Sequence, residues 1–350
     1  MSLGTGILRN NMREKIILIT GSNGEIGQEL IKKLSTISEM KIVALDLHPP
    51  VDEISHLLYE HVIGNILDKN LLEQIGSTYE IYEIYHLAAL LSTRAEFAPH
   101  IAHEVNVTGT LNMLTLAVDQ AKSQGKAIKF FFPSSIAIYG LDDKDIKHSA
   151  GAITEQEYCN PITMYGCNKL YCEKLGIYYS THFHQLSEDY QNNLIDFRSI
   201  RFSGLISNIT EPQGGTSDYI PQMLHAAARG ETYQCFVNKN TRMPFMTMED
   251  AINSVAQLMN ANNSAIISRI YHLSTFSPTP EEFANTLKYY FPNFQIEYVI
   301  NHKRQQMVDS WPLDLNCDKA KKEWNWQPQH NLETAFSEYL IPGVKKHYNI

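Results

Sequence analysis

The feature that most constrains this fold is an alternation of strand-like and helix-like segments over roughly the first 200 residues. Short apolar runs rich in β-branched residues are separated by stretches in which apolar residues recur at helical spacing. The predicted strands are residues 15–20, 41–46, 61–64, 81–89, 127–134 and 194–202. This order predicts an α/β fold in which a parallel sheet is doubly wound, with helices on both faces and right-handed crossovers.

The pattern changes after Gly204. Glycine, proline and polar residues cluster at positions 211–217, and the elements that follow are shorter. Helical spacing returns at residues 221–229, 249–260, 280–290 and 332–339. We expect a sheet domain over residues 15–204 and a smaller C-terminal α/β lobe over residues 205–350, with one excursion back to the sheet.

Composition excludes several classes of protein. A formal net charge of −9 leaves no basic face for nonspecific nucleic-acid binding, and no run reaches the ~18 apolar residues of a membrane span. The five cysteines form no Cys-x-x-Cys pair, and His100 and His103 lack ligating partners nearby, so we expect no metal. Free thiols are typical of a reducing compartment, which indicates the cytoplasm or the mitochondrial matrix.

A glycine-rich turn, Gly21-Ser-Asn-Gly24-Glu-Ile-Gly27, follows the first predicted strand and opens a helix. In such turns the first glycine makes the tight bend, the second lets a pyrophosphate approach the backbone, and the third allows close packing. The helix N-terminus offers unpaired N–H groups to the phosphates. Asp46 ends the second strand ~20 residues downstream, where a ribose-binding carboxylate is expected and would repel a 2′-phosphate. These residues predict a Rossmann-type domain that binds NAD.

A second motif, Tyr165-Gly-Cys-Asn-Lys169, places a lysine four positions after a tyrosine. On a helix this spacing puts both side chains on one face. A free phenol has a pKa of about 10 and is a poor base, and a neighbouring ammonium lowers that pKa. We therefore expect Tyr165 to act as a general base, with Lys169 lowering its pKa.

Two serines, Ser134 and Ser135, end the fifth predicted strand upstream of this pair. Open α/β sheets place their active sites at the carboxyl ends of the strands. A hydroxyl at such a position can hydrogen-bond to a reacting oxygen. We expect Ser135 to orient the substrate oxygen and Ser134 to support it.

These motifs together resemble the extended short-chain dehydrogenase/reductase superfamily. His86-Leu-Ala-Ala89 and Asn106-Val-Thr-Gly-Thr110 also match its pattern, and the resemblance covers residues 15 to about 340. At this level it leaves nucleotide-sugar epimerases, dehydratases and reductases open.

Several segments narrow the resemblance to short-chain-type L-threonine 3-dehydrogenases. They are residues 86–92, 204–207, 214–219, 241–251 and 309–312, with Trp324-Asn-Trp326. The chain departs from that pattern in four places. Asn65 stands where an aspartate is expected, Gln213 and Ser217 replace a glycine and a threonine, Phe202-Ser203 replaces a Tyr-Pro pair, and residues 185–193 look like an insertion.

This resemblance implies NAD-dependent oxidation of L-threonine to L-2-amino-3-oxobutanoate, with Tyr165, Lys169 and Ser135 as catalytic residues. It implies contacts to NAD from Gly21, Ser22, Asn23, Gly24, Glu25, Ile26, Gly27, Asp46, Asn65, Ile66, Leu87, Ala88, Ala89, Asn106, Tyr165, Lys169 and Leu205. It implies contacts to the substrate from Ser92, Ser134, Ser135, Tyr165, Gly215, Thr216, Ser217 and Trp311.

The resemblance also implies a homodimer, because helices expected at residues 97–123 and 161–180 form four-helix interfaces in the superfamily. Apolar residues recur along the first helix at Ile101, Val105, Leu111, Leu114 and Val118. The keto acid product would feed a 2-amino-3-ketobutyrate CoA ligase in threonine catabolism.

Two other functions stay open at this point. A nucleotide-sugar epimerase or dehydratase would need basic residues for a diphosphate, and Arg201, Arg229, Arg242 and Arg269 are available. A non-catalytic dinucleotide-binding regulator would keep the glycine-rich turn but would have no need for the serine, tyrosine and lysine together.

Overall fold

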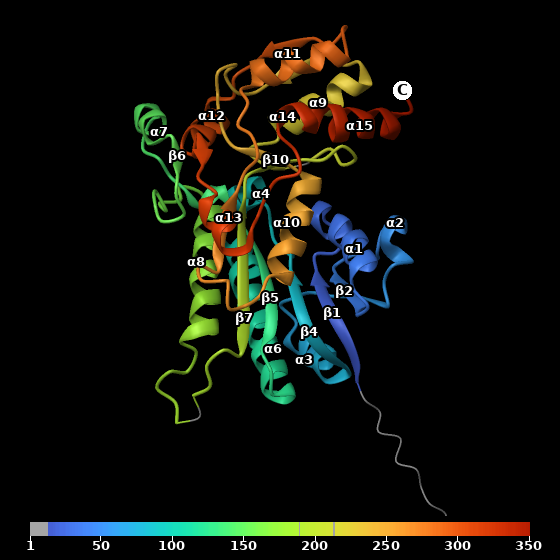
Figure 1. Cartoon of the computed structure of the whole chain (residues 1–350), viewed down its shortest axis with the longest axis vertical. Helices are drawn as coiled ribbons and strands as arrows, with labels where there is room; N and C mark the ends of the chain where they lie inside the picture. The colour runs from blue at the N-terminus through green and yellow to red at the C-terminus, as the bar shows by residue number, and fades with distance from the viewer. Residues whose placement is uncertain (1–12, 189, 213) are drawn as a thin grey trace, which may run out of the picture.

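The computed structural model describes residues 13–188, 190–212 and 214–350. Its central sheet is parallel and follows the order β11-β7-β5-β4-β1-β2-β3 (Figure 1). The strands are β1 (Glu14–Thr20), β2 (Lys41–Asp46), β3 (Glu60–Ile63), β4 (Tyr79–His86), β5 (Ile128–Ser135), β7 (Ile195–Phe202) and β11 (Ile270–Leu273). The strand order reverses between β1 and β4, and such a switch point is where doubly wound sheets place their ligands.

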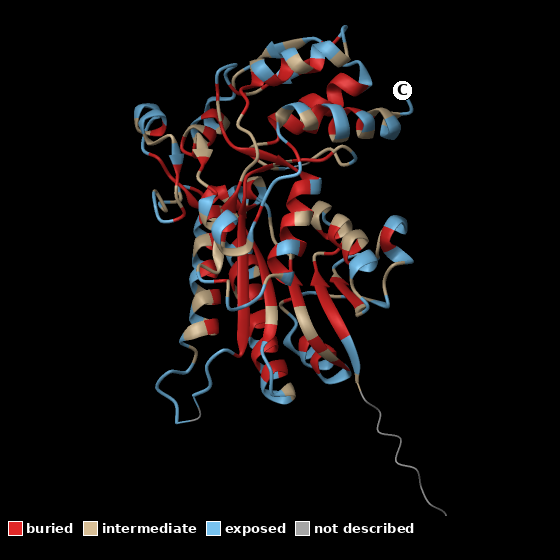
Figure 2. Cartoon of the chain, viewed as in Figure 1, coloured by how far each residue is buried: buried red, intermediate tan, exposed pale blue. Residues whose placement is uncertain are grey.

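The sheet is covered on both faces because its strands are almost continuous apolar runs. In β1, Ile17 and Ile19 belong to one core, while Ile16 and Leu18 belong to the other, as the two-residue period of a strand requires. The first core includes α1 (Glu25–Ile37) and α10 (Met248–Asn260). The second includes α3 (Lys69–Thr78), α6 (Gly109–Gln124) and α8 (Met164–Thr181). Figure 2 shows the buried residues concentrated along the strands.

A smaller α/β lobe lies beyond the carboxyl ends of the strands, at the top of Figure 1. Three two-stranded parallel ribbons occur here and at its base: β8 (Gly204–Ile206) with β10 (Phe245–Thr247), β9 (Tyr233–Cys235) with β12 (Ile296–Tyr298), and β6 (Ala152–Ile153) with β13 (Asp314–Leu315). Its helices are α9 (Tyr219–Arg229), α11 (Pro280–Tyr290), α12 (His302–Asp309), α14 (Leu332–Thr334), η3 (Ala335–Leu340) and α15 (Ile341–Tyr348). The chain returns from this lobe to add β11 to the sheet edge beside β7.

The remaining elements are short. They are α2 (Asp52–Ser55), α7 (Lys144–Ala150), α13 (Asp318–Trp324) and the 3₁₀ turn η2 (Ile136–Ile138). The segment 185–193, of which residue 189 lies outside the described part, joins α8 to β7 at the amino end of the sheet, far from the lobe (Figure 1). Within the described ranges, no helix is both long and apolar enough to cross a membrane.

The helix expected over residues 97–123 begins two residues later, at Pro99, and its helical residues continue to Gln124, with a π-helical turn inside it and a separate short helix before it. The chain forms α4 (Ser92–Phe97), α5 (Pro99–His103), the π-helical turn η1 (Glu104–Thr108) and then α6. Ala98 leaves the helical region with φ −137° and ψ 64°. The cause is Pro99, because a residue that precedes proline is disfavoured in the helical conformation. The π-helical turn of η1 then shifts the register before α6.

Candidate active site

The carboxyl ends of β1, β2, β4 and β5 open into a cavity of about 760 Å³ between the sheet and the lobe. This volume is typical of a site for a small molecule or cofactor. The predicted catalytic and substrate residues all border it: Ser92, Ser134, Ser135, Tyr165, Lys169, Gly215, Thr216, Ser217 and Trp311. The predicted cofactor residues border it too, except Ser22 and Asn106.

The glycine-rich turn forms one end of the cavity. Gly21 has φ +71°, and a Cβ there would lie 2.6 Å from the backbone nitrogen of Ala88. A Cβ on Gly27 would lie 2.5 Å from the carbonyl oxygen of Gly21. A Cβ on Gly24 would come no closer than 3.4 Å to its neighbours, at the carbonyl oxygen of Gly21, so Gly24 leaves space toward the cavity. The turn is therefore tight on its inner side and accessible to a phosphate on its outer side.

Asp46 lies at the end of β2 and points toward this turn. Its Oδ2 accepts a hydrogen bond from the backbone N–H of Asn23 at 3.0 Å, and its Oδ1 accepts from the N–H of His48 at 3.3 Å. Each oxygen keeps a lone pair for a ribose hydroxyl. Asn65 also borders the cavity, but its Oδ1 accepts from the N–H of Leu67 at 3.0 Å.

Tyr165 and Lys169 lie one turn apart near the start of α8, where Thr163 caps the helix by accepting from the N–H of Gly166. Lys169 Nζ donates to the carbonyl oxygen of Pro133 at 2.6 Å and lies 5.4 Å from the centroid of the Tyr165 ring. Burial lowers the pKa of Lys169 to about 8, and the charges of Cys172 and Glu173 oppose that shift.

The expected lowering of the Tyr165 pKa is not what this structure shows. Burial raises the pKa of Tyr165 well above its ordinary value. The ammonium of Lys169 faces the Pro133 carbonyl and does not offset this effect. The phenol is therefore protonated here, and becoming a base requires further positive charge beside it.

The two adjacent serines of β5 point in different directions. Ser135 Oγ accepts from the backbone N–H of Ala137 at 3.1 Å, and its own hydrogen has no acceptor among the described residues. Ser134 Oγ instead donates to Glu173 Oε1 at 2.5 Å. The Ser134 hydroxyl, which was predicted to support the reaction, thus donates its hydrogen to a buried carboxylate. The Ser135 hydroxyl keeps its hydrogen available for a reacting oxygen.

A buried polar chain extends from Glu173 into the lobe. Arg201 donates to both carboxylate oxygens of Glu173, each at 2.7 Å, and to the Tyr139 hydroxyl at 3.0 Å. His272 bridges Tyr139 and the lobe: its Nδ1 lies 2.7 Å from the Tyr139 hydroxyl and its Nε2 lies 2.8 Å from the carbonyl oxygen of Asn316. Burial lowers the pKa of His272, so a neutral imidazole accepts from Tyr139 and donates to Asn316.

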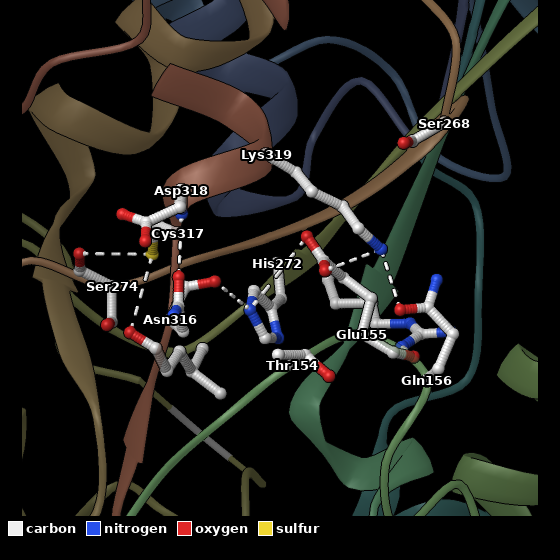
Figure 3. Close-up of polar contacts among 12 residues, drawn as sticks. Thr154, Glu155, Gln156, Ser268, His272, Ser274, Asn316, Cys317, Asp318 and Lys319 are labelled. Atoms are coloured by element: carbon white, nitrogen blue, oxygen red, sulfur yellow. Dashed lines mark hydrogen bonds and ion pairs between the residues drawn. The ribbon is translucent and has the colours of Figure 1, made fainter. Parts of the chain in front are cut away.

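A second charged pair closes the outer end of this chain. In Figure 3, His272 lies between Asn316 and Glu155, and Lys319 reaches toward Glu155 and Gln156. Lys319 Nζ lies 3.0 Å from Glu155 Oε2 and donates to Gln156 Oε1 at 2.7 Å. The buried charges of this network are thus matched, which fits a role in fastening the lobe to the sheet.

The substrate end of the cavity is built from two segments. The Thr216 hydroxyl and the Thr216 N–H each lie 3.2 Å from Ser92 Oγ. Arg304 of α12 donates to the carbonyl oxygen of Gly215 at 2.6 Å, and Asp218 accepts from the Gly215 N–H at 2.7 Å. Ser217 borders the cavity, and its neighbour Gln213 lies outside the described residues. The indole nitrogen of Trp311 is buried without a partner among the described residues.

Ser22 and Asn106 correct the predicted cofactor set. The side chain of Ser22 is fully buried, and its backbone packs where a Cβ on Gly27 would lie. The Asn106 amide pairs with both backbone groups of Leu90, accepting from the N–H at 2.7 Å and donating to the oxygen at 3.1 Å. Asn106 therefore holds the loop that borders the cavity and does not line the cavity itself.

His86, in the motif at the end of β4, is also structural. It lies 2.8 Å from the Thr20 hydroxyl and 3.1 Å from the Thr110 hydroxyl. Burial, assisted by the charge of Lys169, lowers its pKa to about 3. A neutral His86 with both ring nitrogens engaged fixes the strand end and does not take part in proton transfer.

Sequence reasoning did not select three charged residues that border the cavity, Arg94, Glu211 and Asp218. Arg94 and Asp218 follow the predicted substrate residues Ser92 and Thr216 by two positions. A charged residue so close in sequence to a predicted substrate residue could have indicated that it also borders the site. Within the described ranges, no group of three His, Cys, Asp or Glu side chains could hold a metal ion.

Comparison with known proteins places this site in a family. Residues 17–274 match the NAD dependent epimerase/dehydratase family. The chain belongs to this family. An uncharacterized epimerase/dehydratase of Staphylococcus saprophyticus is 34% identical over 333 residues, which are 95% of this chain and 97% of the relative.

Two solved structures share the fold of this chain over nearly its whole length. An L-threonine dehydrogenase from Clostridium difficile is 34% identical with a TM-score of 0.82, covering 95% of this chain and 98% of that chain. The holo form of a GalE-like L-threonine dehydrogenase from Cupriavidus necator is 33% identical with a TM-score of 0.82, covering 93% and 99%.

The cofactor of this family member is NAD, as the family description states. The residues present fit it. The accessible side of Gly24 and the N-terminus of α1 would hold the pyrophosphate, and Asp46 would accept from the adenosine ribose. Lys169 and Tyr165 border the cavity farther along, where the nicotinamide half would lie.

Proposed function

We propose that this family member is an L-threonine 3-dehydrogenase, which oxidises the C3 hydroxyl of L-threonine to the ketone of L-2-amino-3-oxobutanoate. The observation that carries the proposal is the position of the Ser92–Thr216 hydroxyl pair, which borders the same cavity as Ser135 and Tyr165. Similarity to threonine dehydrogenases over almost the whole chain supports it.

In this proposal Tyr165 takes the proton of the threonine hydroxyl while the C3–H bond breaks. The chemistry that NAD supplies when bound is acceptance of the C3 hydride and a positive charge on its nicotinamide ring. Lys169 has N–H groups left for the ribose after its bond to Pro133. Ser135 donates to the reacting oxygen and holds it beside Tyr165.

A zwitterionic amino acid needs acceptors for its ammonium group and donors for its carboxylate. The hydroxyls of Ser92, Thr216 and Ser217 and the backbone at Gly215 supply both kinds of group at the cavity. Trp311 borders the cavity with an apolar ring that suits the threonine methyl group.

The basic residues available to a sugar-nucleotide enzyme are engaged elsewhere. Arg201 pairs with Glu173, Arg229 with Glu211 and Glu231, Arg242 with Glu282, and Arg269 with Asp196. None of these four arginines borders the cavity. Among the arginines of the described residues, Arg94 alone borders the cavity, so a diphosphate substrate would meet one arginine there and no cluster, which favours the amino-acid substrate.

We also propose a homodimer formed by α4, α5, α6 and α8. Of the apolar residues noted above, Leu114 and Val118 are buried against the sheet, whereas Ile101 and Leu111 are exposed. They share this exposure with Phe97, Ile162 and Tyr171.

The keto acid would pass to a CoA-dependent ligase. The five free thiols support a reducing compartment, the cytoplasm or the mitochondrial matrix.

The test is formation of NADH by the purified protein with NAD and L-threonine, beside parallel reactions with L-serine, L-allo-threonine and UDP-galactose. We expect turnover that is selective for L-threonine. Conversion of UDP-galactose with no oxidation of L-threonine would reject the proposal in favour of a sugar-nucleotide enzyme. Light scattering of the same sample measures the mass, and a monomer would reject the dimer.

A further inference from the structure

Two carboxyl groups that border the cavity lie close enough for the charge of one to act on the other. Glu25 is the first residue of α1, directly after Gly24 of the glycine-rich turn. Asp218 precedes α9 and borders the cavity from the lobe. A dinucleotide that occupies this site brings further negative charge to the N-terminus of α1.

The two carboxyl groups differ in their partners. Asp218 accepts from the Gly215 N–H at 2.7 Å, and the charge of Arg304 also acts on it. Two further acids border the cavity: Glu211, which pairs with Arg229, and Asp46, which accepts from the N–H groups of Asn23 and His48. Glu25 is half-buried and has no hydrogen bond or ion pair among the described residues. Burial, followed by the charge of Asp218, raises the pKa of Glu25 to about 7.

A carboxylate at this position would oppose a pyrophosphate. Both would be anions at the start of α1, and like charges at short range repel strongly inside a protein. A neutral carboxyl removes that repulsion, and its O–H can donate to a phosphate oxygen. Arg304, whose charge acts on Asp218, already donates to the carbonyl oxygen of Gly215.

We propose that Glu25 determines cofactor affinity through its protonation: NAD binds the form of the protein in which the Glu25 carboxyl carries a proton. Each cofactor bound above neutral pH then takes one proton from solvent onto Glu25. Release of the cofactor returns that proton. The inference concerns binding of NAD alone and holds whichever alcohol the enzyme oxidises.

The test is calorimetric titration of the full chain with NAD, without substrate, between pH 6 and pH 9. Repeating it in two buffers of different ionisation enthalpy counts the protons taken up. We expect Kd to rise about tenfold from pH 6 to pH 8, with uptake approaching one proton per NAD at the upper end. A Kd that stays flat across this range with no proton uptake would overturn the proposal.

Two variants separate Glu25 from other titrating groups. Glu25→Gln keeps the shape of the side chain and should bind NAD about tenfold more tightly than the wild type at pH 8, with no pH dependence. Glu29→Gln, one turn along α1 and paired with Lys32 at 2.7 Å, should keep the wild-type profile. Retention of the full pH dependence in Glu25→Gln would contradict the assignment.

Discussion

Ser134 and Ser135 are neighbours in the chain, yet they belong to two different polar regions. Ser134 joins the chain Glu173–Arg201–Tyr139–His272, in which donors and acceptors are matched. Ser135 faces the cavity with an unused donor, as successive strand residues point to opposite sides. The difference shows where chemistry can occur. Buried polar groups whose hydrogen bonds are all made within the protein stabilise the fold, whereas a group with an unused donor can bind a ligand.

The two regions also differ in whether a buried ionisable group has a partner of opposite charge. The guanidinium of Arg201 is buried against the Glu173 carboxylate. Burial opposes its charge, but the hydrogen bonds and the charge of Glu173, with smaller effects of Tyr139 and Cys159, together keep its pKa raised. In the cavity, burial raises the pKa of Tyr165, which has no such partner, and lowers the pKa of Lys169. We therefore expect substitutions in the cavity to reduce turnover and substitutions in the network to reduce stability.

The largest expected effect is on turnover in Tyr165→Phe. Removing the phenol removes the group that takes the hydroxyl proton, so kcat for L-threonine should fall about 10²–10⁴-fold. Calorimetry should show that NAD still binds, because the glycine-rich turn, Asp46 and Lys169 are unchanged. Tyr289→Phe, on the exposed face of α11 and away from the cavity, is the control and should retain full activity. Near-normal turnover in Tyr165→Phe would remove the tyrosine from the mechanism.

The next effect is on stability in Glu173→Gln. Arg201 would keep a buried charge without its counter-ion, so the free energy of unfolding should fall by about 3–5 kcal/mol. Chemical denaturation measures the change. Glu231→Gln breaks an exposed pair with Arg229 and should cost less than about 1 kcal/mol. Equal losses in the two variants would mean that the buried network does not fasten the fold as described.

The smallest and sharpest contrast is between the two serines. Ser135→Ala should lower kcat about 100-fold, because the reacting oxygen loses its donor. Ser134→Ala should lower the free energy of unfolding by about 1–2 kcal/mol and leave kcat within about threefold of the wild type. The same two assays on both variants measure the contrast. A larger loss of kcat in Ser134→Ala than in Ser135→Ala would reverse the assignment of the two regions.

Much of the fold was predictable from local sequence. The strand at Lys41–Asp46 and the helix at Pro280–Tyr290 have the predicted bounds, because continuous β-branched runs and a Thr-Pro start are strong local signals. The helix predicted at residues 332–339 continues through η3 and α15 to Tyr348. The short helices α7 and α12 had no comparable local signal, and their packing on the lobe stabilises the helical conformation.

The site was less predictable than the fold. Motif spacing brought Ser135, Tyr165 and Lys169 to one cavity, because each motif fixes its own place at the carboxyl edge of the sheet. The partners of Arg201 and the charge conflict at Glu25 depend on side chains far apart in the chain. A local sequence pattern does not predict contacts between side chains that are distant in the chain. For the same reason Arg201 was considered as a phosphate-binding residue, although it lies in a buried ion pair.

The central claim is that this enzyme moves a hydride from C3 of L-threonine to NAD. The most direct measurement uses L-threonine deuterated at C3 with unlabelled NAD, followed by mass spectrometry of the reduced cofactor. The account predicts deuterium at C4 of the nicotinamide, with L-2-amino-3-oxobutanoate as the product. Reduced cofactor without deuterium, or no reduced cofactor from a protein that binds NAD, would contradict it.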